Sequence, residues 1–256
     1  MGPDDVGFQY GEMIAKVYDE WESDFGGDAA AAVDFLHHLV TDGRALELGI
    51  GTGRIGLPLA ARGVRVAGIE ISPGMVEQLR AKPGSEAIDV TIGDMVDVHG
   101  GPFELIFAVY NTMMFICSQE DQVRCFQNVA QNLAPTGVFV VENWIPSEPE
   151  ALRTGQRTRT TVLPRGRVLL EAEDWDQTLQ HIHRRDVLIS AAGIEVYPIE
   201  TRYIWPSELD LMARIAGMRL RERWGGWRNE PYTSASRNHV SVYEWDSAKA
   251  STGTGL

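Results

Sequence analysis

ALELGIGTGRIG, residues 45–56, carries the clearest structural signal in this chain. It has the pattern of a short apolar strand that runs into a glycine loop and then into a helix. A second apolar run, VRVAGIE, ends in an acid at Glu70, 21 residues after Gly49. A strand, a glycine loop and an acid at the end of the next strand are typical of a nucleoside-bearing cofactor lying over the edge of a parallel sheet.

Strand and helix patterns alternate on both sides of this segment. The alternation predicts a doubly wound parallel sheet. The expected strands are 44–48, 64–70, 87–92, 103–109 and 137–143, and the expected helices are 54–62, one opened by Pro73, and 120–133. Residues 1–43 are predicted to form two helices, the second over 29–40.

The pattern changes after Trp144. Residues 157–205 are rich in Thr, Val, Leu, Ile and Tyr, with turn signals at 164–166 and 192–193. This composition predicts three or four antiparallel strands inserted into the main domain. A helix over 206–216 and two last strands over 218–224 and 239–245 should complete the fold.

The composition excludes several classes of function. The net charge of −13 disfavours a nucleic-acid partner, because an acidic surface repels phosphate backbones. Cys117 and Cys125 are the two cysteines and have no metal-site spacing, so reduced thiols are expected. The first residues show no signal-peptide pattern, and no apolar run reaches about 18 residues. We therefore expect a cytoplasmic protein with no membrane partner.

The glycine loop by itself fits two cofactors. Gly51, Gly53 and Gly56 also spell the G-x-G-x-x-G fingerprint of nicotinamide dinucleotides. Glu47 beside the loop opposes a diphosphate, which needs positive potential, and suits a cofactor with an ammonium group and no phosphate. Asp94 adds a second carboxylate just past the third strand. The last two strands also resemble an antiparallel pair that closes the sheet.

Over nearly its whole length the chain resembles the class I S-adenosylmethionine-dependent methyltransferases. The motifs that carry the resemblance are ELGIGTG at 47–53, Glu70, Gly93-Asp94 and the apolar strand that ends in Tyr110-Asn111. The resemblance implies a seven-stranded α/β sheet in the order 3-2-1-4-5-7-6, with strand 7 antiparallel. It also implies S-adenosylmethionine as cofactor and S-adenosylhomocysteine as product.

The resemblance assigns roles at the cofactor. Glu70 would bind both ribose hydroxyls, and Asp94 would hold the adenine amine between Ile71 and Met95. Tyr18 would cover the methionine portion, with Tyr10 as the alternative. Glu47 would act on the loop and, through water, on the methionine ammonium. The complete set of cofactor residues is Tyr18, Glu47, Gly49, Gly51, Gly53, Glu70, Ile71, Asp94, Met95 and Tyr110.

The implied domain organisation has four parts. They are a helical lid over 1–43, a Rossmann-like domain over 44–150 and 206–246, an inserted β-rich substrate or dimerisation subdomain over 151–205, and a flexible tail over 247–256. The insert is loosely similar to that of the actinobacterial antibiotic-sugar N,N-dimethyltransferases. It is also the expected interface of a homodimer.

The acceptor side is less defined. The methyl group leaves near the ends of the fourth and fifth strands, at the switch point of the sheet. The expected substrate contacts are Asn111, Met113, Trp144 and Tyr203, and the candidate catalytic residues are Asn111, Tyr110, His181 and His183. The two histidines share one face of a predicted strand. A third metal ligand is not evident, so no metal is predicted.

The expected function is methyl transfer to a nitrogen or oxygen of a small molecule in secondary metabolism. An amine or an acidic hydroxyl is mildly favoured, because an ordinary hydroxyl needs a base and no strong acid–base dyad stands out. Two alternatives remain. One is a nicotinamide oxidoreductase, and the other is a cofactor-binding protein of the same fold that performs no methylation.

Overall fold

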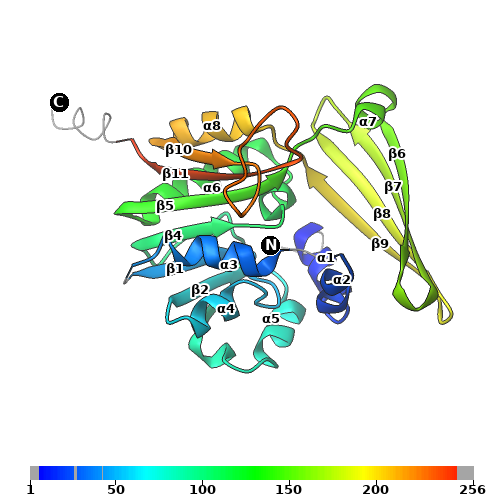
Figure 1. The fold of residues 1–256 in the computed structure, drawn as a ribbon, viewed down its shortest axis with the longest axis horizontal. Helices are drawn as coiled ribbons and strands as arrows, with labels where there is room; N and C mark the ends of the chain where they lie inside the picture. Colours follow the sequence, from blue (N-terminus) through cyan, green and yellow to red (C-terminus); the bar gives the residue numbers. More distant parts are fainter. Residues whose placement is uncertain (1–5, 26–27, 42, 247–256) are drawn as a thin grey trace.

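The computed structural model describes residues 6–25, 28–41 and 43–246, and its main element is a seven-stranded sheet (Figure 1). The strand order is β10-β11-β5-β4-β1-β2-β3. The strands are β1 Arg44–Leu48, β2 Arg65–Glu70, β3 Asp89–Ile92, β4 Phe103–Ala108, β5 Leu133–Trp144, β10 Met218–Trp224 and β11 Asn238–Trp245. Strands β1 to β5 pair in parallel, whereas β11 runs antiparallel to both β5 and β10. The predicted order 3-2-1-4-5-7-6 is confirmed.

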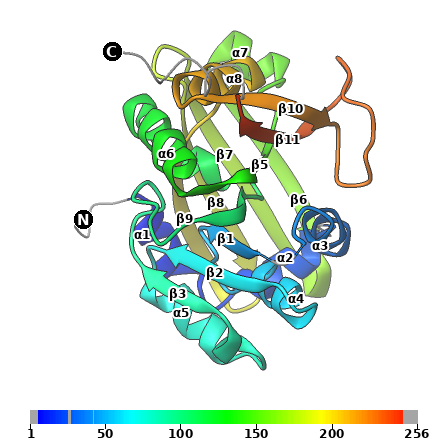
Figure 2. The same cartoon turned by 90° about the vertical axis from the view of Figure 1, so that its left-hand side faces the viewer.

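Helices cover both faces of this sheet (Figure 2). One buried core joins the sheet to α6 Gln119–Asn132 and α8 Pro206–Ile215. The other joins it to α3 Ala29–His37, α4 Gly56–Ala61 and α5 Pro73–Arg80. Neighbouring residues in the sequence fix where two of these helices begin. Ser72 caps α5 and Ser118 caps α6, because their side chains accept hydrogen bonds from the backbone N–H groups of Met75 and Asp121. The sheet is thus held from both sides and presents its carboxyl edge as a rigid platform.

The insert is a separate four-stranded antiparallel sheet in the order β6-β7-β8-β9, as predicted. Its strands are β6 Gln156–Leu163, β7 Arg167–Asp176, β8 His181–Ser190 and β9 Gly193–Arg202, and α7 Pro149–Thr154 leads into it. Helices α1 Val6–Ile14 and α2 Tyr18–Phe25 lie between the two sheets (Figure 1). Ile14 and Trp21 pack there against Leu169 and Leu188 of the insert. The N-terminal helices therefore connect the main sheet to the insert.

Two details of the secondary-structure prediction were wrong. The segment 1–43 contains three helices in its described part, because a turn at 15–17 separates α1 from α2. No glycine or proline marks this turn, so the packing of α1 and α2 into the apolar core between the two sheets decides it. Helix α7 was not predicted. The predicted flexible tail, 247–256, lies outside the described residues.

Two further findings concern surfaces. None of the helices in the described part of the chain combines the length and hydropathy that a membrane crossing needs. The insert exposes Val162, Ile189, Ile194 and Val196 on its strands. The homodimer expected through this subdomain stays a prediction.

Candidate functional site

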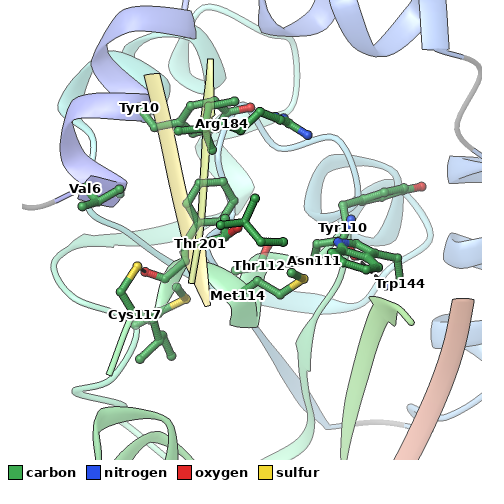
Figure 3. A pocket seen from close by; sticks show the side chains of 18 of the residues that line it. Val6, Tyr10, Tyr110, Asn111, Thr112, Met114, Cys117, Trp144, Arg184 and Thr201 are labelled. Carbon is green, nitrogen blue, oxygen red and sulfur yellow. Dashed lines mark hydrogen bonds between the residues drawn. The ribbon is translucent and has the colours of Figure 1, made fainter. Parts of the chain in front are cut away.

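A cavity of about 1000 Å³ lies between the carboxyl edge of the main sheet, the N-terminal helices and the insert. Its lining begins at the glycine loop and the ends of β2 and β3 and continues past the ends of β4 and β5 to strands β6–β9. Figure 3 shows side chains from these distant segments converging on the same space. The volume is at the upper end of the range for small-molecule sites, so it has room for two ligands side by side.

The glycine loop after β1 is shaped by left-handed backbone. Gly49, Gly51 and Gly53 have φ of +67°, +54° and +81°. A Cβ on Gly51 would meet no atom closer than 4.0 Å, and Gly51 lines the cavity, so its missing side chain leaves space for a ligand. A Cβ on Gly53 would come within 2.9 Å of Leu57. Gly53 does not line the cavity, and its role is helix packing.

Glu70 connects two loops at the cavity wall. Its carboxylate accepts hydrogen bonds from the Gly51 N–H at 2.8 Å and the Ser72 N–H at 2.9 Å. Burial raises the pKa of Glu70, the backbone hydrogen bonds oppose this, and the nearby Glu12 adds to the rise. A carboxylate has about four lone-pair sites, so these backbone hydrogen bonds still leave Glu70 able to accept from a hydroxyl donor in the cavity.

Glu47 lies behind the loop and not in the cavity. It is 4% exposed, and burial raises its pKa well above the ordinary value despite a hydrogen bond from the Gly56 backbone. A Cβ on Gly56 would lie only 2.9 Å from Oε2 of Glu47, so the glycine makes room for this carboxyl group. Because burial disfavours its charge, Glu47 is a weaker argument against a diphosphate than the sequence suggested. Its indirect role at the cofactor stays a prediction.

The residues expected at an adenine lie together. Ile71, Asp94 and Met95 all line the cavity next to Glu70. The Gly93 N–H donates to the Glu70 backbone oxygen at 2.9 Å, which brings the end of β3 beside the end of β2. Asp94 Oδ1 accepts from the Val96 N–H at 2.8 Å, so the carboxylate is held in a turn.

Both candidate lid tyrosines line the cavity. Tyr18 begins α2, and Tyr10 of α1 stacks on Phe115 with ring centroids 5.0 Å apart. Helix α2 is attached to the glycine loop, because Thr52 Oγ1 donates to Asp19 Oδ1 at 2.6 Å. The geometry gives both tyrosines access to a ligand, so the choice between them stays open.

The turn after β4 has unusual backbone. Tyr110 and Asn111 have φ of +54° and +65°, a left-handed conformation that non-glycine residues seldom adopt and that costs on the order of 1 kcal/mol each. Strand β5 holds the turn: the Tyr110 N–H donates to a Glu142 carboxylate oxygen, and the Asn111 N–H donates to the Glu142 backbone oxygen at 3.2 Å. The Trp144 N–H donates to Asn111 Oδ1 at 2.7 Å. Tyr110, Asn111 and Trp144 lie together at one side of the cavity (Figure 3).

Glu142 was not among the residues predicted from the sequence. It is 8% exposed and supports the strained turn through its side chain and its backbone. The available signal was a single acid inside the apolar run GVFVVENW, because a buried carboxylate in such a strand needs a hydrogen-bond donor.

The insert contributes a charged wall that the sequence reasoning also missed. Arg157 lies 3.3 Å from Glu173, Arg159 lies 3.6 Å from Glu171, and Arg184 lines the same wall. The sequence pattern could have revealed this wall, because charged residues alternate along RTRT in β6 and EAED in β7 and so share one face of the sheet. The wall offers paired charges of both signs to an acceptor.

Four of the predicted substrate and catalytic residues do not line the cavity, in addition to the predicted cofactor residues Glu47 and Gly53. Met113 and Tyr203 are buried in apolar cores, at 0% and 3% exposure. His181 and His183 lie on the opposite face of β8 from the cavity-lining Ile182 and Arg184. The geometry therefore supports neither substrate contact by the first pair nor general-base catalysis by the second.

The chain is similar to known methyltransferases in sequence and in fold. Residues 45–137 match the family described as a methyltransferase domain. The CcbJ methyltransferase of Streptomyces caelestis is 36% identical and superposes with a TM-score of 0.87 over 93% of this chain and 98% of that one. The cypemycin N-terminal methyltransferase of Streptomyces sp is 27% identical over 92% of this chain and 97% of that protein. The dTDP-4-amino-2,3,4,6-tetradeoxy-D-glucose N,N-dimethyltransferase of Saccharopolyspora spinosa is 31% identical over 53% of this chain and 56% of that protein.

Proposed function

Because the chain belongs to the class I S-adenosylmethionine-dependent methyltransferases, we propose that it methylates an amine nitrogen of a small molecule made in secondary metabolism. The observation that carries the proposal is the continuous cavity from the Gly51–Glu70 wall to the charged wall of the insert, with Asn111 between them. One end fits the cofactor and the other is open to an acceptor.

S-adenosylmethionine is the cofactor, and this chain's own residues fit it. The open side of Gly51 gives the ligand close access to the backbone. We assign the ribose hydroxyls to Glu70, the adenine to Ile71, Asp94 and Met95, and the cover of the methionine portion to Tyr18 or Tyr10. The sulfonium supplies an electrophilic methyl group, so the protein's main task is to position the acceptor in line with it.

Asn111 is the proposed positioning group for the acceptor. Its Oδ1 already accepts the Trp144 N–H at 2.7 Å, which fixes the plane of the amide. The oxygen keeps a second lone pair, and the amide NH₂ remains as a donor. A side chain held in this way can orient an amine whose own lone pair points at the methyl group. The strained backbone keeps the amide at the end of β4, where the two halves of the cavity meet.

The nature of the groups around the acceptor favours nitrogen over oxygen. A hydroxyl needs a base within hydrogen-bond reach, whereas an amine needs only to be neutral. No histidine is among the described residues that line the cavity. The carboxylates of the insert wall, Glu171 and Glu173, are each engaged in an ion pair with an arginine. The name of the Saccharopolyspora spinosa relative specifies N,N-dimethylation, and the name of the cypemycin enzyme specifies an N-terminus.

Matched acceptor pairs test the proposal. The purified protein is incubated with S-adenosylmethionine and pairs of amino sugars or short peptides that differ only by an amine or a hydroxyl. We expect release of S-adenosylhomocysteine and a gain of one methyl group with the amine member alone. The rate should rise with pH as the acceptor amine loses its proton.

Two outcomes would contradict the proposal. Methylation of the hydroxyl member alone would assign oxygen as the acceptor atom. Tight cofactor binding without product from any acceptor class would favour the alternative of a non-methylating protein. The nicotinamide alternative is not supported, because the family assignment identifies a methyltransferase.

A further inference from the structure

Two histidines and a carboxylate meet on the face of the insert that points away from the cavity. His181 and His183 alternate along β8, and Glu200 is paired with His183 across the β8–β9 ladder. One ligand atom from each of the three side chains lies within 4.8 Å of the other two. The cluster is accessible, because the His183 side chain is 51% exposed.

The hydrogen bonds of His181 determine which of its ring nitrogens carries a proton. Its Nε2 lies 2.9 Å from the backbone oxygen of Cys117, which can only accept, so Nε2 carries the hydrogen. In the neutral ring Nδ1 is then bare, and it lies 3.1 Å from Oε1 of Glu200. A bare ring nitrogen and a carboxylate oxygen repel each other unless a cation lies between them. That cation is either a proton or a metal ion.

The spacing fits a metal ion. Ligands held about 2.0–2.2 Å from a tetrahedral zinc ion lie about 3.3–3.5 Å from one another. The His181–Glu200 distance is 3.1 Å, and His183 Nδ1 lies 3.7 Å from Oε2 of the same carboxylate. All three ligand atoms lie within 4.8 Å of one another, so side-chain rotations that draw them together would place a common centre between them. A carbonyl oxygen that accepts from the far nitrogen of a ligating histidine is also the usual outer support of such sites.

The charges around the cluster favour a cation. Asp174 and Asp176 of β7 are paired with His183 and His181, so both carboxylates lie on the same face. Arg185 is the neighbouring cation on this face of β8. Arg202, which is paired with His181 on β9, is neutralised by Glu208 at 2.6 Å.

We propose that His181, His183 and Glu200 form a binding site for a divalent first-row metal ion of the zinc type. Two imidazoles and one carboxylate are a ligand set that zinc accepts, with remaining positions open to water. The ion would join β8 to β9 and, through His181, hold both against the Cys117 backbone. Cys117 lines the cavity, so the site stabilises one wall of it without touching the reacting groups.

Zinc titration of the chelator-treated full chain, followed by calorimetry near neutral pH, tests the site. We expect one zinc ion per chain, with binding at least tenfold weaker in Glu200→Gln and in His181→Gln, because loss of even an outer-shell partner weakens metal sites 10- to 100-fold. The matched control is the double variant His37→Gln/His38→Gln. In the wild type these two histidines lie at the end of α3 with their ring centroids 6.3 Å apart, and they are not part of the Glu200 cluster. The double variant should bind zinc like the wild type, as should Cys117→Ser.

A second measurement separates a metal site from a simple ion pair. Zinc should raise the thermal unfolding midpoint of the wild type and of the His37/His38 control, but not that of Glu200→Gln. His183→Gln, at the most exposed ligand, provides the same test if the Glu200 variant does not fold. Absence of binding heat, equal affinity in all ligand variants, or loss of binding in the control would overturn the proposal. The cluster would then be a protonated histidine paired with Glu200.

Discussion

The carboxylate of Glu70 accepts a hydrogen bond from the backbone N–H of Gly51 at 2.8 Å, across the gap between the loops that follow β1 and β2. Because β1 and β2 are parallel neighbours in register, with Leu48 beside Ile69, their carboxyl ends reach the same edge. The acid that should bind the cofactor therefore also shapes the loop that receives it. Loop geometry and ligand affinity are coupled through one side chain.

Replacement of Glu70 by Gln should weaken S-adenosylmethionine binding by about 1.5–3 kcal/mol, or about 10- to 150-fold, through loss of charge-assisted hydrogen bonds. Calorimetry on the purified variant measures the dissociation constant. Glu77→Gln, on the exposed side of α5, is the control and should leave binding unchanged. An unchanged constant in the Glu70 variant would exclude the ribose role.

Replacement of Gly51 by Ala should place a methyl group in the cavity on left-handed backbone. We expect a loss of about 1 kcal/mol in the free energy of unfolding and a marked loss of cofactor affinity. Gly63→Ala is a matched control, because its φ is +91° and its Cβ would meet no atom within 4 Å. Both variants should lose similar stability in urea titrations. If the Gly51 variant binds cofactor normally, the cofactor does not approach this backbone.

Replacement of Asn111 by Gly should lower kcat without weakening the binding of the cofactor. Glycine tolerates the φ of +65°, so this change removes the amide and keeps the backbone. We expect kcat to fall by about 10²-fold through misplacement of the acceptor, with the cofactor dissociation constant unchanged. Asn111→Ala, which adds backbone strain, should be less stable than the glycine variant. Full activity of the glycine variant would show that the amide does not position the acceptor.

Asp186 should make the protein less stable as pH rises from about 4 to 6. Burial raises its pKa to about 6, with Arg184 opposing the rise and Glu171 and Glu173 adding to it. Arg184 Nε and Asp186 Oδ1 lie 3.0 Å apart, but neither forms a well-aligned hydrogen bond, so the pair compensates the burial poorly. In the unfolded chain the pKa is about 3.9. Between these values the folded state holds the extra proton, so the free energy of unfolding falls as pH rises.

The variant Asp186→Asn should cancel this dependence. Its stability relative to the wild type should increase on the order of 2–3 kcal/mol between about pH 4 and pH 7 in urea titrations. Asp174→Asn, an exposed position on the neighbouring strand, should show no comparable trend. A constant difference between Asp186→Asn and the wild type across this range would show that Asp186 titrates normally.

His239 should contribute to acid destabilisation. Its side chain is 0% exposed, and its pKa is lowered to about 3, first by burial and then by the charge of Arg223, with Asp210 opposing. The unfolded histidine titrates near 6.5, so below that pH the unfolded state binds the extra proton and stability falls by up to about 1.4 kcal/mol per pH unit. His239→Gln should have a shallower acid limb in pH-dependent unfolding, whereas exposed His99→Gln should not. Identical slopes in all three proteins would contradict the burial effect.

The end of the cavity that we propose for the cofactor could be predicted because its residues lie within a few positions of strand ends. Glu70 and Asp94 follow β2 and β3, and the order of parallel strands places such residues at one edge. The acceptor half could not be predicted in this way. The short helical turn Thr112–Phe115 rotates Met113 into the core while Thr112 and Met114 reach the cavity, and strand position alone does not specify that rotation.

Local patterns in the sequence were sufficient for the strands and the glycine loop, because apolar periodicity and glycine conformation act over a few residues. The sheet order was implied by the resemblance to the methyltransferase family. Only the tertiary structure decided which face of the inserted sheet points into the cavity. The insert alternates polar residues on both of its faces, so the sequence could not tell that Arg157 and Glu173 face the cavity while His181 and His183 face away. It also could not show Glu200 beside those histidines, because that contact depends on the register of β8 with β9. Burial, which raises the pKa of Glu47, is likewise a property of the assembled layers.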